Sequence, residues 1–492
     1  MIDATFAALE SVNDFLWGYV GVALILGGGA LVSRRLGWVQ LRAPTRVLLT
    51  ALSLLRQPSS DTSNQQNKRG VAPARAFFAS LGGCVGIGNL AGVAVGVQIG
   101  GPGVLVWMWI VALLGMALKY GEVYLGMTTR RPNEQGSYDG GPMYVLAQAF
   151  PSCQTWLPKL AAGLLCLYGV EIYLFGVIKE TAATSWSLPA PLVSALLLAL
   201  VILGTSGGVR RIGAISGILV PLFGLAFLAM TLWIVLSNAS KIPALLATIF
   251  QSAFRGHSAV DSFAGSTFIL VVSRGLATAC YSGDVGIGYA SIIHSESRSR
   301  DPCRQASLSM LDIALDTFIC TCAALLVLLT GVWHEPVNGN LAVQVALAKT
   351  FPYMHVFMPM LFFCLGYTTL LAYMIAGLKC AAFLNAKWGK KVYWGFATVA
   401  FTVFSFVEPH HALSVMLFAG GLLMILNCGA LLRLRSKIHF APADPKTPDN
   451  ASYNDSEKAG GKASCDSLIP ERTSRSRRSS ARRGTRMFCG RC

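Results

Sequence analysis

The sequence has few charged residues for its length. Asp, Glu, Lys and Arg make up 13% of its 492 residues, whereas 54% are hydrophobic and the mean hydropathy is +0.55. A water-soluble domain carries about twice this share of charge, so a soluble globular fold is excluded. The regular alternation of a membrane barrel is also missing, because the apolar runs are longer than its roughly 10-residue strands. The composition therefore predicts an all-α polytopic membrane protein.

Several functional signatures are absent as well. There is no phosphate-binding loop or metal-ligating cluster, which argues against an ATP-driven pump. The 13 cysteines are scattered, mostly within apolar runs, where they are expected as small core residues rather than disulfides. Cys489 and Cys492 form a CxxC without the second pair that a structural zinc needs. The first apolar run precedes Arg34 and Arg35, the reverse of a secretory signal.

One membrane-length apolar run contains its own interruption. Residues 77–103, FFASLGGCVGIGNLAGVAVGVQIGGPG, exceed the roughly 20 residues that cross a bilayer, yet hold six glycines before the final GGPG and the polar Asn89. Each glycine weakens a helix by about 1 kcal/mol relative to alanine, so GIGN predicts an unwound segment. Unwound backbone at membrane depth lines a cavity or is buried in protein, and it offers carbonyls to a cation and amides to a carboxylate. The alternative is a GxxxG packing helix with an interhelical asparagine.

A second apolar run, residues 262–293, is interrupted in the same way. Gly283, Gly286 and Gly288 break it, Asp284 lies beside them, and Arg274 lies one helix face away. A charge at bilayer depth costs about 2.5–3.5 kcal/mol, so its presence indicates function or pairing. The alternatives are a structural Arg274–Asp284 pair or a simple glycine kink. Two breaks five spans apart are the pattern expected of an inverted-repeat transporter that couples a solute to an ion.

The hydropathy pattern predicts about eleven spans. They lie near residues 15–32, 77–103, 104–127, 160–178, 190–204, 213–236, 262–293, 306–332, 353–378, 392–407 and 412–432. Lys and Arg number 20 in the loops on one side and 4 on the other. The positive-inside rule then puts the N-terminus outside and the C-terminus in the cytoplasm.

This count divides the chain into four regions. Residues 1–36 form an extra N-terminal span, and 37–75 form a basic cytoplasmic loop with an amphipathic piece near 45–55. Residues 76–432 form the transporter core, with one repeat at about 76–236 and the other at about 260–432. The tail, 433–492, carries 14 Lys and Arg against 6 Asp and Glu. We expect it to be disordered and either to contact anionic lipid or to have no binding role, so the net charge of +17 does not indicate nucleic acid.

Five stretches resemble the alanine or glycine:cation symporter family. They are GIGNLAGVAVGVQIGGPGVLVWMWIVALLGMALKYGEV, GSYDGGPMYVL, GVRRIGAISG, YSGDVGIGYASIIHS and LLVLLTGVW, which fall within residues 77–380 in the family's order. The resemblance implies a five-plus-five inverted-repeat (LeuT-like) core with two broken helices, preceded by one extra N-terminal helix. It also implies transport of a small neutral amino acid, alanine or glycine of either hand, into the cell with sodium.

The resemblance implies a role for particular residues. In the first break, bare amides between Gly88 and Gly92 would hold the substrate carboxylate, with Asn89 lining the site. In the second break and over the side-chain pocket, the matching residues are Tyr281, Ser282, Gly286 and Tyr373. For sodium, the matching carbonyls are those of Gly82 and Val85, and the matching hydroxyls are those of Thr368 and Thr369. For the two threonines the alternative is ordinary bonding to a helix carbonyl one turn back.

The sequence also departs from the family's pattern. Ile87 replaces the usual threonine of GTGN, and Ser282, Gly283 and Asp284 replace Ser-Asn-Glu. Asp284 and Glu171 could therefore carry protons in place of sodium or beside it.

The predicted protein is a multi-pass transporter of a bacterial inner membrane, surrounded by lipid and not an enzyme. A proton-coupled permease of the same fold is the main alternative, and a channel or a membrane-embedded enzyme is a weaker one. The oligomeric state is left open.

Overall fold

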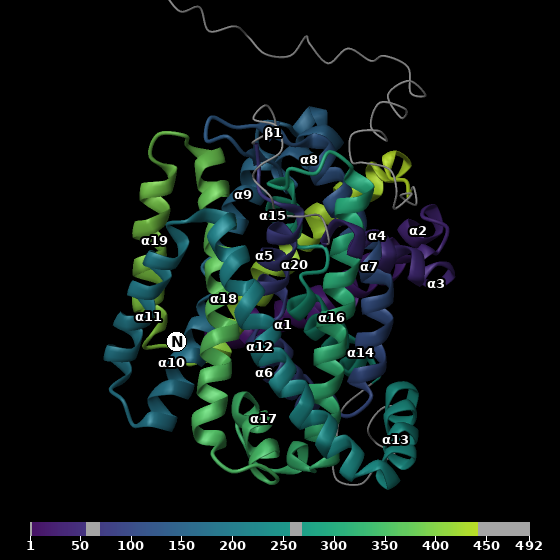
Figure 1. Ribbon diagram of the computed structural model, residues 1–492, viewed down its shortest axis with the longest axis vertical. Coiled ribbons are helices and arrows are strands. Elements are labelled where there is room, and N and C mark those ends of the chain that lie inside the picture. The colour runs from purple at the N-terminus through teal and green to yellow at the C-terminus, as the bar shows by residue number, and fades with distance from the viewer. Residues whose placement is uncertain (1, 56–68, 256–267, 441–492) are drawn as a thin grey trace, which may run out of the picture.

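The computed structural model describes residues 2–55, 69–255 and 268–440, and its elements are almost all helices. Within these ranges, the strands form one short antiparallel hairpin, β1 (Arg131–Pro132) with β2 (Tyr138–Asp139). Most of the long helices run along the long axis of the molecule (Figure 1). The predicted helical architecture is confirmed. The CxxC and most of the basic tail lie outside the described residues.

Seven helices in the described part of the chain are long and apolar enough to cross a membrane. They are Thr5–Arg35, α7 (Val104–Thr129), Leu157–Trp186 (α9, Leu157–Tyr168, with α10, Ile172–Trp186), α12 (Gly208–Ser237), α16 (Pro302–Leu329), α18 (Met354–Leu384) and α20 (Pro409–Arg433). The pair α5 (Pro73–Cys84) and α6 (Ala91–Gly100) forms an eighth, bent by 51°.

Three of the eleven predicted spans are not among these long helices. The helices α11 (Ala190–Thr205), α14 (Phe268–Gly283) and α19 (Gly389–Phe404) have 16 residues each, below the roughly 20 that cross a bilayer unaided. The start of the predicted span 262–293 lies outside the described residues, and α15 (Tyr289–Ser295) follows α14 after a gap of five residues. The count of eleven spans therefore stays a prediction.

The N-terminal helix is longer than the predicted 15–32. It runs through α1 (Ile2–Phe15), two π-helical segments (Leu16–Gly21 and Ala23–Gly28) and α2 (Gly29–Arg35). Asn13 Nδ2 and Trp17 Nε1 donate to the carbonyls of Ser414 and Leu417, at 2.8 and 3.1 Å. These bonds hold the helix against α20.

Short helices complete the fold. The predicted amphipathic piece is α4 (Pro44–Leu55), which buries Val47, Ala51 and Leu54 and exposes Leu48 and Leu49. The remaining helices are α3 (Val39–Arg42), α8 (Pro142–Ala149), α13 (Ile242–Arg255) and α17 (Gly339–Ala348), with 3-10 turns at Ile87–Asn89, Pro151–Cys153, Ala239–Lys241, Val332–His334 and Arg435–Lys437. Figure 1 shows α8 and β1 at one end of the molecule and α13 and α17 at the other.

The two interrupted helices lie inside the bundle. The first half-helix, α5, packs against α12, α16 and α18, and α14 packs against α7, α6 and α16. No disulfide joins the ten cysteines of the described ranges, and six of them are buried, as expected of core residues. The bundle thus surrounds both interruptions with protein, as unwound backbone at membrane depth requires.

Candidate functional site

The first interruption is an unwound turn closed by Asn89. α5 ends at Cys84, the chain is extended at Val85 and Gly86, and α6 begins at Ala91. The fully buried Asn89 accepts the Gly86 N–H at its Oδ1, at 2.9 Å. A buried amide without a hydrogen-bond partner raises the free energy of the fold, so this bond offsets part of the cost of unwinding the helix inside the bundle. The predicted break at GIGN is confirmed.

The second interruption lies between α14 and α15 and relies on left-handed backbone. Gly286 and Gly288 have φ of +77° and +103°, which glycine adopts without strain. Asp284 has φ of +52°, in a region that Asp tolerates better than most residues. The glycines explain why the chain can turn here, so the interpretation as a mere kink in one continuous helix is wrong.

The two interruptions face each other and share one carboxylate. A Cβ placed on Gly88 would lie 3.5 Å from the Tyr281 ring and 3.8 Å from the Cα of Ser282. Asp316 of α16 accepts from Asn89 Nδ2 at 2.5 Å and from Ser282 Oγ at 3.3 Å. It is only 3% exposed. Sequence reasoning missed Asp316, although a charge within a membrane-length apolar run was a usable signal.

A cavity of about 50 Å³ opens beside the two breaks. Gly88 and Tyr281 line it at the breaks, and it extends along α6 and α14 as far as Ile99 and Arg274. A Cβ on Gly92 would meet nothing within 4 Å, so this glycine leaves space in the cavity for a bound molecule. The structure thus brings the predicted Gly88, Gly92 and Tyr281 to one cavity, with Asn89 and Ser282 packed against Asp316 behind it.

Two predicted substrate residues lie away from this cavity. The Gly286 carbonyl accepts from Asn427 Nδ2 at 3.2 Å, within the protein core. The Tyr373 ring stacks on Tyr289, with ring centroids 4.3 Å apart, and its hydroxyl donates to Asp284 Oδ1. In this conformation Tyr373 therefore contacts the far side of the second break rather than the cavity.

The predicted sodium ligands form a cluster of hard oxygen atoms. The hydroxyls of Thr368 and Thr369 lie 3.3 and 2.9 Å from the Gly82 carbonyl oxygen. Both hydroxyls also lie near the Leu365 carbonyl, at 2.7 and 3.1 Å, so bonding within the helix occurs here too. Val85 lies three residues beyond Gly82 with extended backbone. Oxygen atoms of this kind are the ligands that hard cations prefer.

Ser216 adds an unpartnered hydroxyl to this cluster. It is fully buried on α12, and its Oγ makes no hydrogen bond. A Cβ placed on Gly82 would lie 2.3 Å from that oxygen, so only glycine allows the approach. A buried hydroxyl without a partner is unfavourable, and a cation bound beside the Gly82 carbonyl would give this one a partner. The donor set therefore fits a sodium ion.

The predicted acidic residues are each held by tyrosine. Asp284 accepts from Tyr373 and, at 3.6 Å, from the Cys84 thiol. Glu171, between α9 and α10, accepts from the Tyr281 hydroxyl at 3.1 Å.

Arg274 binds elsewhere. It pairs with Asp14 of the N-terminal helix at 3.1 Å, so the alternative of an Arg274–Asp284 pair is wrong.

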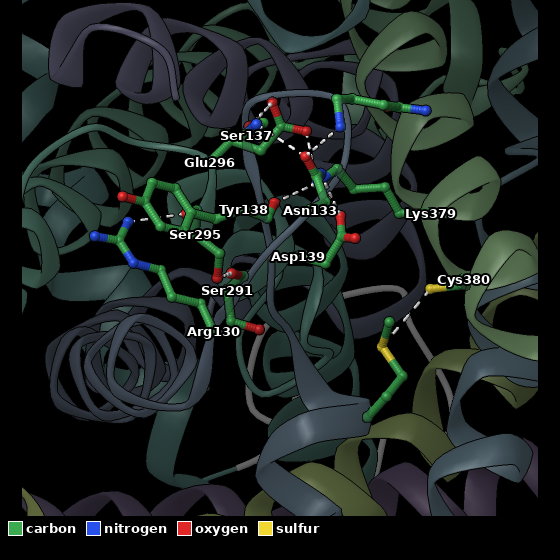
Figure 2. A network of polar contacts seen from close by, with 12 residues as sticks. Arg130, Asn133, Ser137, Tyr138, Asp139, Ser291, Ser295, Glu296, Lys379 and Cys380 are labelled. Atoms are coloured by element: carbon green, nitrogen blue, oxygen red, sulfur yellow. Dashed lines mark hydrogen bonds and ion pairs between the residues drawn. The ribbon is translucent and has the colours of Figure 1, made fainter. Parts of the chain in front are cut away.

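Polar contacts link several segments at the end of the molecule that carries α8 and β1 (Figure 2). Lys379, near the end of α18, pairs with Glu296 at 2.6 Å and with Asp139 of β2 at 3.1 Å. Arg130, just after α7, donates to the carbonyl of Ser295 at 3.0 Å. We call the group of Lys379, Glu296 and Asp139 the clasp. It joins three segments: the β-hairpin, α18, and the residue that directly follows α15.

Comparison with known proteins places the chain in a family. The sequence profile of the sodium:alanine symporter family matches residues 3–459. An uncharacterized transporter of Haemophilus influenzae is 31% identical over 87% of this chain and 94% of its own length. The sodium/alanine symporter AgcS of Methanococcus maripaludis is 30% identical over 80% of this chain and 87% of its own. The probable sodium/glutamine symporter GlnT of Bacillus subtilis is 26% identical over 91% and 90%.

These matches agree with the apolar helices, and they indicate a membrane transporter rather than an enzyme. Since the profile spans nearly all of the described residues, the chain belongs to the sodium:alanine symporter family.

Proposed function

We propose that this protein imports a small neutral amino acid, alanine or glycine, together with sodium across a bacterial inner membrane. The observation that carries the proposal is the pair of facing helix interruptions joined by Asp316. Interrupted helices that meet within a bundle are the usual site for solute and ion in secondary transporters. The proposed core is the five-plus-five repeat at residues 76–432, with the N-terminal helix outside it.

The cavity would take the substrate. Amides between Gly88 and Gly92, in the turn before α6 and in its first residues, would bind the carboxylate, since the first amides of a helix have no partner within it. The Leu90 amide is excluded, because it donates to the Ile87 carbonyl at 3.0 Å. Carbonyls near Tyr281 and Ser282, at the end of α14, would bind the ammonium. The small volume favours a short side chain. The relative named for glutamine means that family membership by itself leaves the substrate open.

Sodium would bind next to the first break. The Gly82 and Val85 carbonyls and the Thr368 and Thr369 hydroxyls would hold it, and the orphan hydroxyl of Ser216 would join them. An ion there would link α5 to α18 and α12. By thermodynamic linkage, the ion would raise the affinity for substrate and the substrate would raise the affinity for the ion equally.

The arrangement corresponds to an outward-facing state. The cavity lies along α6 and α14, toward the end with α13 and α17, and the clasp closes the opposite end. The Lys and Arg count assigns the clasp end to the cytoplasm, with the N-terminus outside and the C-terminus inside. Import would require the clasp to part while the outer cavity closes.

Proton coupling is the second candidate, and the buried carboxylates favour it. Three acidic side chains near the breaks are 0–3% exposed, and each accepts a hydrogen bond from a hydroxyl or an amide group. They are Asp316, Asp284 and Glu171. Carboxyl groups of this kind within a bundle are typical of proton relays.

The deciding experiment is uptake of labelled alanine and glycine by the purified full-length protein in liposomes, under an imposed sodium or proton gradient. Accumulation driven by the sodium gradient alone supports the proposal. Accumulation driven only by protons supports the second candidate. Equilibration without accumulation under either gradient indicates a channel and contradicts both.

A further inference from the structure

Lys119 is a fully buried lysine in the middle of α7. Its Nζ donates to the Gly283 carbonyl and to Cys84 Sγ, each at 2.8 Å. A buried ammonium is unfavourable in the membrane unless surrounding groups offset its charge. The position of this side chain therefore needs an explanation beyond packing.

The two partners of Lys119 occupy equivalent places in the fold. Cys84 is the last residue of α5 and Gly283 is the last residue of α14, so each ends the first half of an interrupted helix. The C-terminal end of a helix carries partial negative charge and carbonyls without a partner in the helix. The Lys119 ammonium thus lies where two such ends meet.

Nearby carboxylates add to this negative environment. Asp284 accepts from the thiol of Cys84, and both Asp284 and Asp312 interact electrostatically with Lys119. Glu122, one turn along α7, also interacts electrostatically with Lys119, but it takes its hydrogen bonds from the Ser291 amide at 3.2 Å and from Asn427 at 3.1 Å. The hydrogen bonds of Lys119 are made to the ends of the two interrupted helices and not to Glu122.

We propose that the Lys119 ammonium is a tethered cation that occupies the meeting point of the two interruptions in place of a free ion. It would keep the ends of α5 and α14 together throughout the cycle, and only the cation at Gly82, Thr368 and Thr369 would be exchanged. The claim that only this one cation is exchanged rests on the proposed function. The claim that Lys119 holds the two helix ends together concerns the folded protein alone and can be tested without transport.

The test removes the tether and supplies a free ion. Lys119→Ala removes the ammonium and the three methylene groups that carry it, and it leaves space at the two helix ends, so the purified protein should unfold at lower temperature than wild type in choline chloride. Ammonium chloride at equal ionic strength should restore most of that loss. Lys179→Ala is the matched control, because Lys179 also donates to a carbonyl, that of Ser405 at 2.7 Å, but away from the interruptions. Ammonium should not restore its stability.

A neutral side chain of similar length gives the second variant. Lys119→Gln should be destabilised as well, and its uptake rate should fall roughly tenfold or more, as for loss of a buried charge on which other groups depend. Wild-type stability of Lys119→Gln overturns the proposal. So does a Lys119→Ala protein that ammonium does not stabilise, or the failure of both variants to fold even with ammonium present.

Charge measurements test the exchange of a single ion. In liposomes, Lys119→Ala in sodium should carry about one more charge per substrate than wild type, because a mobile ion now enters the vacated place. An unchanged ratio, with ammonium still stabilising the variant, overturns the claim about exchange. If the wild type shows no uptake at all, the stability result stands and the proposed function fails.

Discussion

Asn89 and Asp316 are joined by a hydrogen bond of 2.5 Å between Nδ2 and Oδ1, although 227 residues separate them. The same asparagine accepts the Gly86 amide, and the same carboxylate accepts from Ser282. One amide and one carboxyl group therefore hold both unwound segments in place. Because each is buried, replacing either leaves the other without its partner.

Asn89→Leu should abolish uptake while the protein still inserts into the membrane. Leucine has nearly the same size but cannot bond to Gly86 or Asp316, and each buried group left unpaired costs about 1–3 kcal/mol. Uptake in liposomes, with yield and gel-filtration profile as measures of folding, checks this. Normal uptake by the variant would remove Asn89 from the site.

Asp316→Asn should lower uptake roughly tenfold or more, since hydrogen bonds to a charged group are worth about 1.5–3 kcal/mol. The change keeps the size of the side chain, removes its charge and replaces one of its two acceptor oxygens by an N–H donor. Uptake at matched protein density is the measurement. A variant with wild-type rate would mean that Asp316 does not order the two breaks.

Thr368→Val with Thr369→Val should raise the sodium concentration for half-maximal uptake by roughly tenfold, as expected when two oxygen ligands of a hard cation are removed. Valine preserves the branched shape of threonine. A sodium titration of initial rates checks this. An unchanged sodium response would favour protons or a different ion site.

Ser216→Ala should also raise the half-maximal sodium concentration, with the maximal rate retained. Thr231→Val is its control, because Thr231 lies on the same helix, is equally buried and likewise has an unpartnered hydroxyl, but is 15 residues away. The same titration compares the two. A shift in both variants, or in neither, would contradict a role for Ser216 at the ion.

Gly92→Ala should fold normally and shift preference from alanine toward glycine. The added methyl group meets open space in the structure, so it reduces the cavity volume available to the substrate. One methyl group in a binding pocket changes discrimination by about 10–200-fold. Competition between labelled alanine and glycine measures the effect. In Gly96→Ala the methyl would lie 2.6 Å from Thr278 Oγ1, so loss of stability is expected there instead.

Lys379→Met should open the clasp end and lower the apparent affinity for substrate applied from the opposite side by roughly tenfold, because apparent affinity falls with the population of the binding-competent state. Lys349→Met is the control, since Lys349 pairs with Glu335 at 2.7 Å in a more exposed place. Uptake from each side of the membrane separates the two effects. Equal behaviour of both variants would mean that the clasp does not gate the exit.

The sequence was sufficient to predict both interruptions. Glycines and a single Asn or Asp within otherwise apolar runs favour an unwound segment over a continuous helix. Gly286 and Gly288 adopt the left-handed backbone that this pattern allows. The partners were not predictable, because Asp316 and Lys119 reach the breaks only through the packing of α16 and α7. Tyr373 was expected over the side chain of the substrate, yet it bonds to Asp284 instead.

Helix boundaries were harder to predict than the breaks. Hydropathy marks where a run is apolar, but the first helix begins at Ile2 rather than at residue 15, and α19 begins three residues before the predicted 392. Helix ends depend on local caps and on neighbours, which hydropathy does not report.

The clasp has one ammonium group for two carboxylates that come from different segments. Glu296 and Asp139 repel one another whenever Lys379 withdraws, so half-open arrangements are unfavourable. Release of α18 from both carboxylates should then happen in a single step. This end of α18 would have two discrete positions, with no stable half-open state through which solute could leak.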